Sequence, residues 1–237
     1  KVVADLEEKL PENQLPLIPM NVVLFPGNIL PLHIFESRYK LMVEFCVEQE
    51  SCFGVVLIKK GKEVGGMSIP YLVGTSVQII ETDYQEDGRI NLITLGQHRF
   101  EILDLVYDRP YLVGEIRTQS LENQQAGDNL EQIALTARNL YENYETWLTK
   151  TIPDWELPDR IPTSPDQLSS QIGTRLQITL REKQEMLEIF DIDQLLIHQI
   201  QLLKYENQRL SASVLAQSKF DILHPKRKAF WKNSSLN

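Results

Sequence analysis

The pattern of apolar and polar positions changes once along the chain, near residue 127. Before that point, short stretches rich in β-branched and aromatic residues are separated by turn residues, a pattern typical of β-strands. Asp87 and Gly88 stand between two such stretches and predict a hairpin with a type I′ turn, in which both central residues have positive φ. Strands are predicted at residues 21–25, 53–59, 75–84, 89–95, 100–107 and 111–119.

One helical pattern interrupts these strands between Glu36 and Glu50. Apolar residues recur there at the spacing that brings them to one face of a helix. The residues on that face are Tyr39, Met42, Val43, Phe45 and Cys46. We therefore expect one helix to be inserted early in the β-rich part.

After Gly127 the helical period dominates, and helices are predicted near residues 128–149, 165–172, 180–190 and 192–218. Capping residues mark their starts: Asp128 with Glu131, Ser164 with Pro165, Thr179 with Glu182, and Asp191 with Gln194. The sequence thus predicts an α+β protein. A β-rich lobe occupies residues 1–127, an α-helical lobe that ends in a long helix occupies 128–220, and a basic tail occupies 221–237.

Charge and motif content narrow the possible functions. The 24 basic and 33 acidic side chains give a net charge of −9, which argues against a dedicated nucleic-acid binder. No phosphate-binding loop or hydrolase motif is present, and His33, His98, His198 and His224 fall on four different predicted elements. We therefore expect no cofactor, no metal and no catalytic residues.

The cysteine content indicates a cellular compartment, and the prolines bear on whether the chain crosses a membrane. Two cysteines, Cys46 and Cys52, are too few for a disulfide scaffold, which favours a reduced compartment, the cytoplasm or the plastid stroma. The longest segment without charged residues, 13–35, contains four prolines and therefore predicts no transmembrane helix. A targeting segment removed before Lys1 would leave no trace here.

Several separated motifs resemble the N-terminal, substrate-binding domain of Lon protease. The first lies at residues 15–27, LPLIPMNVVLFPG, and is followed by PLHIFESRY at 31–39, where a Phe-Glu-x-Arg-Tyr run opens the first helix. The likeness continues with VGTSV at 73–77, LGQHRF at 95–100 and QITLREKQEMLE at 177–188. It covers residues 15–218, with the motifs in the order of the family.

This resemblance implies a PUA-like β-rich lobe, a helical lobe, and recognition of protein substrates without cleavage. The protease continues into ATPase and Ser-Lys proteolytic modules, for which these residues offer no counterpart. We therefore expect a stand-alone, non-enzymatic module that binds a polypeptide client or a protein partner, as an adaptor in protein quality control. The alternative is an RNA-binding PUA-like protein, favoured by Lys59, Lys60, Lys62 and the basic tail but opposed by the net charge.

A site for polypeptides requires exposed apolar groups, and the junction between two lobes is where such clefts form. The candidates near strand or helix ends are Phe35, Tyr39, Tyr71 and Tyr111, for each of which core packing is the competing interpretation. Glu36 and Arg38 are interpreted as a structural ion pair.

The last long helix carries a second candidate surface. Leu196, Leu203 and Leu210 alternate with Ile200, Asn207 and Val214 at heptad spacing, which is typical of a dimeric coiled coil. Because Leu195, Ile197 and Leu202 widen the apolar stripe, the pattern also suits packing inside the helical lobe, and we favour that interpretation. The chain is expected to be a monomer or a weak dimer.

Overall fold

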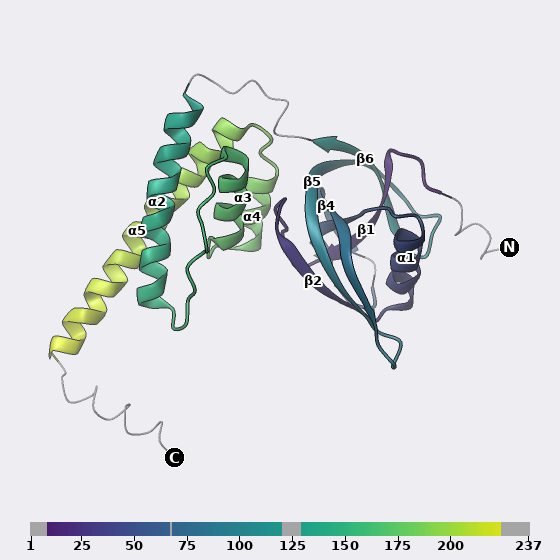
Figure 1. The fold of residues 1–237 in the computed structure, drawn as a ribbon, viewed down its shortest axis with the longest axis horizontal. Coiled ribbons are helices and arrows are strands. Elements are labelled where there is room, and N and C mark those ends of the chain that lie inside the picture. The colour runs from purple at the N-terminus through teal and green to yellow at the C-terminus, as the bar shows by residue number, and fades with distance from the viewer. Residues whose placement is uncertain (1–8, 67, 120–128, 224–237) are drawn as a thin grey trace, which may run out of the picture.

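The computed structural model describes residues 9–66, 68–119 and 129–223. A curved sheet and one helix make up its first part, and four further helices make up the second (Figure 1). The strands are β1 (Gln14–Met20), β2 (Ile29–Ile34), β3 (Phe53–Gly61), β4 (Ser68–Tyr84), β5 (Ile90–Val106) and β6 (Leu112–Gln119). The helices are α1 (Ser37–Glu48), α2 (Leu130–Thr151), α3 (Pro165–Arg175), α4 (Leu180–Leu187) and α5 (Ile192–Leu223). The expected α+β class is confirmed.

The sheet closes on itself through the long strand β5. The strand order is β2-β5-β4-β3-β1-β6, and β5 also pairs with β6, so β5, β4, β3, β1 and β6 form a ring. Strand β5 pairs with β2 along its first part and with β6 along its second part. Register shifts interrupt the β4–β5 and β5–β6 ladders, and such bulges bend a sheet toward closure.

The strand prediction was wrong at the start of the chain. Residues 21–25 are not a strand but follow β1, and β2 was not predicted. Neither β1 nor β2 was predicted, because the prolines in both segments are typical of breaks in a strand. Pro31 is tolerated because β2 is an edge strand, and β1 pairs with β6 over residues 14–17 and with β3 over 17–20, so each half has one open side.

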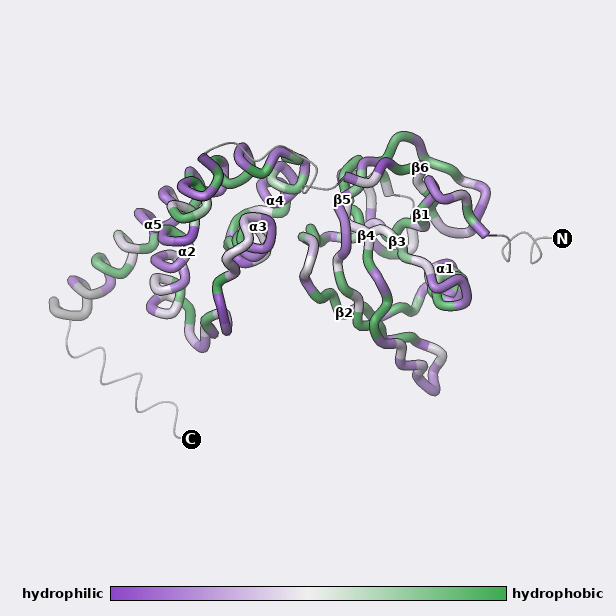
Figure 2. The backbone as a smooth tube through the Cα atoms, turned by 45° about the horizontal axis from the view of Figure 1, so that its top comes forward, coloured by the Kyte–Doolittle hydropathy of each residue, from purple (hydrophilic) through white to green (hydrophobic). Residues whose placement is uncertain are grey.

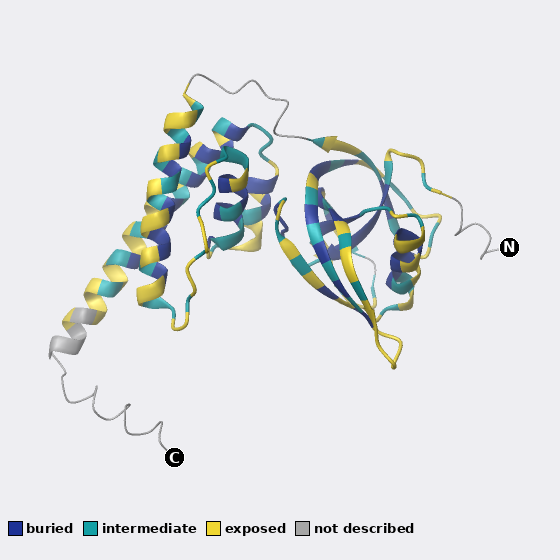
Figure 3. Ribbon diagram, viewed as in Figure 1, coloured by how far each residue is buried: buried dark blue, intermediate teal, exposed yellow. Residues whose placement is uncertain are grey.

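Two other predicted strands, 89–95 and 100–107, are one continuous strand, because pairing with β4 carries β5 through Gly96. The hairpin before it exists, but its turn is not type I′. Gly88 has φ +76° and its amide donates to Gln85 O over 2.9 Å, whereas Asp87 has no positive φ. This is the geometry of a type I turn followed by a bulge glycine. The hairpin tip is hydrophilic (Figure 2) and exposed (Figure 3).

Helix α1 packs against the sheet with the predicted face. All five predicted residues are buried, and they share a core with Phe53 and Val55 of β3. Burial raises the pKa of the Cys46 thiol to about 12, as expected for a cysteine that serves as a small hydrophobic side chain.

Helices α2 to α5 lie close to the predicted ranges. The Thr179–Glu182 capping box has both of its hydrogen bonds, and Asp191 Oδ1 accepts from the Gln194 amide over 2.9 Å. Pro165 stands at the first position of α3, although Ser164 makes no side-chain capping bond. Asp128 lies outside the described residues, and Asn129 is the N-cap of α2.

Helices α3 and α4 lie between the sheet and the α2–α5 pair, and they form the junction between the two parts (Figure 1). Phe25 is fully buried there, and a Cβ added at Gly173 of α3 would lie 2.6 Å from its ring. Arg99 of β5 donates to Leu187 O over 3.3 Å and to Ile189 O over 2.6 Å. Gln184 Nε2 donates to Val73 O over 3.0 Å. The junction is therefore a packed core with buried polar contacts.

Apolar residues of α5 that were candidates for association pack inside the helical part of the chain. Leu196, Leu203 and Leu210 are buried and Ile200 is half-buried, all within the core shared with α2. The Asn207 Nδ2 group donates to Leu140 O of α2 over 2.9 Å, whereas its buried Oδ1 has no partner among the described residues. This is the intramolecular packing that the broad apolar stripe indicated.

Candidate functional site

The four aromatic candidates do not gather at the junction. Phe35 follows β2 and is 52% exposed, whereas Tyr39 of α1 and Tyr111 before β6 are buried in the core beneath α1. Tyr71 alone of the four packs against the junction core, with Lys59 Nζ 5.8 Å from its ring. The expectation of a shared site at the junction was therefore wrong for Phe35, Tyr39 and Tyr111, because all three belong to the α1 side of the sheet.

Three adjoining pockets bring those same residues together, and we call them the α1 groove. The first, of about 300 Å³, is lined by Pro19, Arg38, Tyr39, Ser68, Tyr107, Arg109, Pro110, Tyr111 and Leu112. The second is a narrow space of about 70 Å³, lined chiefly by Pro19, Met20, His33, Phe35, Glu36, Tyr39, Glu63 and Val64. The third, of about 600 Å³, is lined by His33, Phe35, Gln85, Asp87, Arg89 and Asn91. Pro19 and Tyr39 line both the first and the second pocket, and His33 and Phe35 line both the second and the third.

The corner between β2 and α1 places Phe35 at the middle of this groove. Pairing of β2 with β5 brings His33 Nδ1 to 2.7 Å from Asn91 Oδ1, and the chain then turns into α1 with Glu36 as the N-cap residue. Phe35 lies between these two fixed points. Phe35 is more than half exposed at this corner.

A charged pair at the start of α1 contacts the loop that carries Val64. Arg38 Nη2 lies 3.0 Å from Glu36 Oε2, which confirms the expected ion pair. The same carboxylate accepts from the Gly65 amide over 3.3 Å, and Arg38 Nη1 donates to Gly66 O over 3.4 Å. These contacts hold the β3–β4 loop against α1, with Val64 54% exposed. The four named residues of the Phe-Glu-x-Arg-Tyr run, Phe35, Glu36, Arg38 and Tyr39, therefore all line the groove.

The electrostatics of the groove suit binding. Burial raises the pKa of both Tyr39 and Tyr111, so both phenols stay protonated at neutral pH. Arg109 donates to the Tyr111 hydroxyl over 3.1 Å and lies over the Phe45 ring at 4.8 Å. Across the described ranges, His, Cys, Asp and Glu form no group of three that could hold a metal. Apolar contact with a mixed-charge rim is what this arrangement offers a ligand.

Sequence reasoning missed several groove residues: Met20, Glu63, Val64, Tyr107 and Arg109. They lie at strand ends or on loops, where neither a period of two nor one of 3.6 marks the side that faces a site. The signal available was an apolar residue isolated among polar neighbours, as with Val64 between Glu63 and Gly65.

A closed sheet with one packed helix, joined to a helical part and bearing a groove of apolar and charged residues, defines the class of this protein as an α+β domain. The family model described as the ATP-dependent protease La (LON) substrate-binding domain matches residues 14–205. The chain therefore belongs to this family, as its motifs indicated.

Similar proteins agree with this assignment. Lon protease of Anaeromyxobacter dehalogenans (strain 2CP-C) is 28% identical over 206 residues, covering 84% of this chain and 24% of that protein. Lon protease 2 of Myxococcus xanthus is 28% identical over 217 residues, covering 87% and 25%. The chain thus spans about a quarter of the length of the curated relatives it matches.

Solved structures show the same fold. The Lon N-terminal domain protein from Xanthomonas campestris superposes with a TM-score of 0.59 at 24% identity. The N-terminal domain of the Mycobacterium avium complex Lon protease superposes with a TM-score of 0.63 at 15% identity. Each comparison covers 81% of this chain and 98% of the other.

Proposed function

We propose that this chain is a polypeptide-binding module that takes exposed apolar segments of protein clients into the α1 groove and does not itself cleave them. The observation that carries the proposal is that Phe35 and Val64, both more than half exposed, line the same pocket of the groove. Membership in a family of substrate-binding domains supports it.

The groove favours short and reversible contacts. Full burial of one large apolar side chain contributes about 1.5–3 kcal/mol, and association costs several kcal/mol in lost freedom of motion. Phe35 and Val64 together therefore support modest affinity for any one segment. Such affinity suits a protein that samples many unfolded clients.

The proposal extends to properties beyond the binding site. We propose a PUA-like lobe at residues 1–127, a helical lobe at 128–220 and a tail at 221–237, in a monomer or weak dimer that acts as an adaptor in the cytoplasm or plastid stroma. The closed sheet supports the PUA-like lobe. The burial of the apolar residues of α5 against the other helices supports the helical lobe. No helix in the described ranges is long and apolar enough to span a membrane.

RNA binding is the competing function. Lys59, Lys60 and Lys62 are exposed on β3 and the loop after it, which is the observation that favours it. Glu63 follows them directly, and the net charge of −9 opposes a polyanion.

Phe35→Ala is expected to weaken binding of an apolar client about tenfold, which corresponds to about 1.4 kcal/mol, because the truncation removes an exposed ring that lines two of the three pockets of the groove. The probe is a C-terminally amidated peptide with two phenylalanines, no charged side chain and an uncharged N-terminal dansyl label, titrated with the full chain. Its affinity should change little between low and high salt.

Tyr205→Ala is the matched control, because Tyr205 is an exposed aromatic residue of α5 that lines none of the three pockets of the groove. It should bind the peptide like the unaltered chain. Equal affinities for Phe35→Ala and the unaltered chain would contradict the proposal, and so would tight RNA binding with a steep salt dependence.

A further inference from the structure

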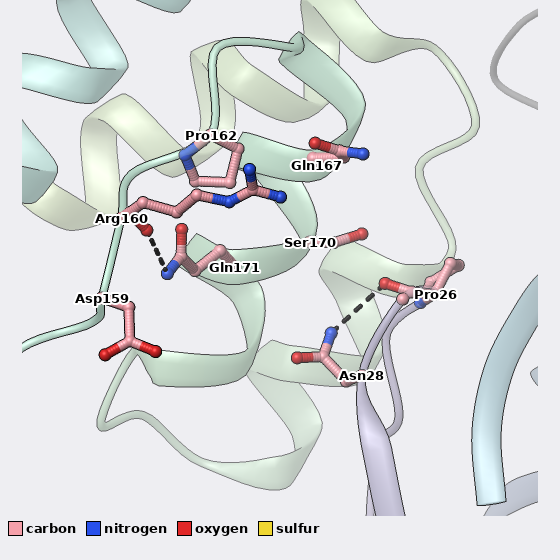
Figure 4. Close-up of a pocket in the computed structure, with 9 residues that line it drawn as sticks. Pro26, Asn28, Asp159, Arg160, Pro162, Gln167, Ser170 and Gln171 are labelled. Atoms are coloured by element: carbon pink, nitrogen blue, oxygen red, sulfur yellow. Dashed lines mark hydrogen bonds between the residues drawn. The ribbon is translucent and has the colours of Figure 1, made fainter. Parts of the chain in front are cut away.

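A separate pocket of about 580 Å³ lies at the junction of the two parts (Figure 4). One wall is the connection into β2, the second is the connection between α2 and α3, and the third is α3 itself. The lining residues are Pro26, Gly27, Asn28, Asp159, Arg160, Pro162, Gln167, Ser170 and Gln171. None of them belongs to the α1 groove, and most are polar.

The pocket has hydrogen-bond donors without partners. Within the described part of the chain, the Arg160 guanidinium makes no hydrogen bond or ion pair, and the Gln167 amide makes none either. The Ser170 side chain extends from α3 toward the wall formed by Pro26 and Asn28 (Figure 4). Ser170 is only 7% exposed and its hydroxyl has no partner among the described residues.

Acceptors face the same space. Asn28 uses its Nδ2 group on Phe25 O at 3.1 Å and Pro26 O at 3.2 Å, which leaves Oδ1 available. Gln171 uses Nε2 on Arg160 O at 3.2 Å, and its buried Oε1 has no partner. Gln171 Oε1 is closed to solvent, so a ligand reaches it only if that side chain turns, and Asn28 Oδ1 is the acceptor that is open to a ligand.

The Arg160 guanidinium is the group of the pocket that can bind an anion. Arg160 directs its guanidinium along α3, whereas the Asp159 carboxylate points away from it (Figure 4). Among the described residues, no salt bridge joins the two groups, which leaves the guanidinium donors open to a ligand. A guanidinium group binds a carboxylate through two parallel hydrogen bonds, which makes a carboxylate the best-matched anion for it.

We propose that the junction pocket binds a peptide carboxylate together with the backbone next to it. Arg160 holds the carboxylate, and the mixed donors and acceptors of Asn28, Gln167, Ser170 and Gln171 match the N–H and C=O groups of a peptide. A volume of 580 Å³ lies within the usual range for pockets that hold small ligands and accommodates a few residues. This inference rests on the proposed polypeptide-binding function and adds a chemical feature of the client.

Three alanine pentapeptides, each labelled at the N-terminus with an uncharged dansyl group, test the inference by titration with the full chain. One has a free C-terminal carboxylate, one is amidated, and one is amidated with a central glutamate. The free acid, the glutamate peptide or both should bind at least tenfold more tightly than the neutral amide, and the comparison shows whether the carboxylate comes from a chain end or a side chain. Equal affinities for all three peptides would overturn the inference.

Arg160→Gln should bring every peptide to the affinity of the neutral amide. Arg181→Gln should leave the preference intact, because Arg181 is an exposed arginine of α4 that does not line the pocket. A preference that survives Arg160→Gln would also overturn the inference.

The two binding proposals fail independently. Phe35→Ala should weaken the apolar peptide and leave the preference for carboxylate unchanged, because Phe35 lies in the α1 groove. Arg160→Gln should have the converse effect. If Phe35→Ala leaves the affinity for the apolar peptide unchanged and the carboxylate preference is intact, the proposed role of the α1 groove is contradicted. The proposed role of the junction pocket is then still supported.

Discussion

Arg99→Ala is expected to lower the free energy of unfolding by about 2–4 kcal/mol, because it removes a buried side chain and leaves two carbonyl groups without a donor. Arg99 is 2% exposed, and its guanidinium donates to Leu187 O and Ile189 O where α4 ends. Burial lowers the pKa of Arg99 to about 10, and a nearby Asp166 opposes that shift, so the side chain is charged at neutral pH. Arg99 Nε and Nη2 have no partner in the described structure, which limits its net contribution.

Urea unfolding of the full chain measures this effect. Arg181→Ala is the control, since an exposed ion pair contributes less than about 1 kcal/mol. A loss from Arg99→Ala no larger than that of the control would contradict the view that Arg99 fastens the sheet to the helical part. Arg99→Lys should fall between the two, because an ammonium group keeps the charge but not the shape of the guanidinium.

Glu145→Ala is expected to cost about 3–5 kcal/mol, because it leaves a partly buried arginine without its counter-charge. Glu145 is 2% exposed. Arg175 binds it with two hydrogen bonds, Nε to Oε1 at 2.7 Å and Nη2 to Oε2 at 2.8 Å. Trp155 Nε1 donates to Oε2 over 2.8 Å. Together these contacts join α2, α3 and the connection between them.

The same carboxylate makes stability depend on pH. Burial acts to raise the pKa of Glu145, but hydrogen bonds from Arg175 and Trp155 outweigh it and hold the pKa below the usual value of 4.5. A carboxyl whose pKa is lower in the folded state stabilises the protein fully above its ordinary pKa and loses that contribution as pH falls through the folded value. Stability should therefore decline below pH 4.5.

Glu145→Gln should show a flatter decline in that acidic range, because the amide does not titrate. Glu185→Gln, which alters a more exposed partner of Arg181, should keep the decline of the unaltered chain. Identical pH profiles for Glu145→Gln and the unaltered chain would show that another group controls acid stability.

Local signals in the sequence predicted local structure. The buried face of α1 and the Thr179 capping box depend on residues three or four apart, which a pattern can show. Strands β1 and β2 were missed because Pro16, Pro19 and Pro31 predict breaks in a strand. A proline is tolerated on the unpaired side of a strand, and only the pairing of β1 and β2 shows which side that is. The closed ring through β5 is likewise a property of pairing, which no single segment carries.

The junction and the sites depend on contacts far apart in the chain. Arg99 and Ile189 are 90 residues apart, and Gln184 and Val73 are 111 apart. The motif at residues 31–39 pointed to the correct corner of the sheet, but Val64 and Arg160 come from loops whose position is set by the fold. Some of the aromatic candidates are exposed in the groove and others are buried in the core. The local pattern could not separate them, because the side chain of a residue at the end of a strand can point toward the core or toward solvent.

Photo-crosslinking tests the α1 groove most directly. The amidated apolar peptide, with one phenylalanine replaced by a benzophenone analogue, is irradiated with the full chain and the adducts are mapped by mass spectrometry. Adducts should fall on residues 33–39, 63–66 and 107–111, which line the groove, and should diminish in Phe35→Ala. Adducts confined to α2 and α5 would contradict the account.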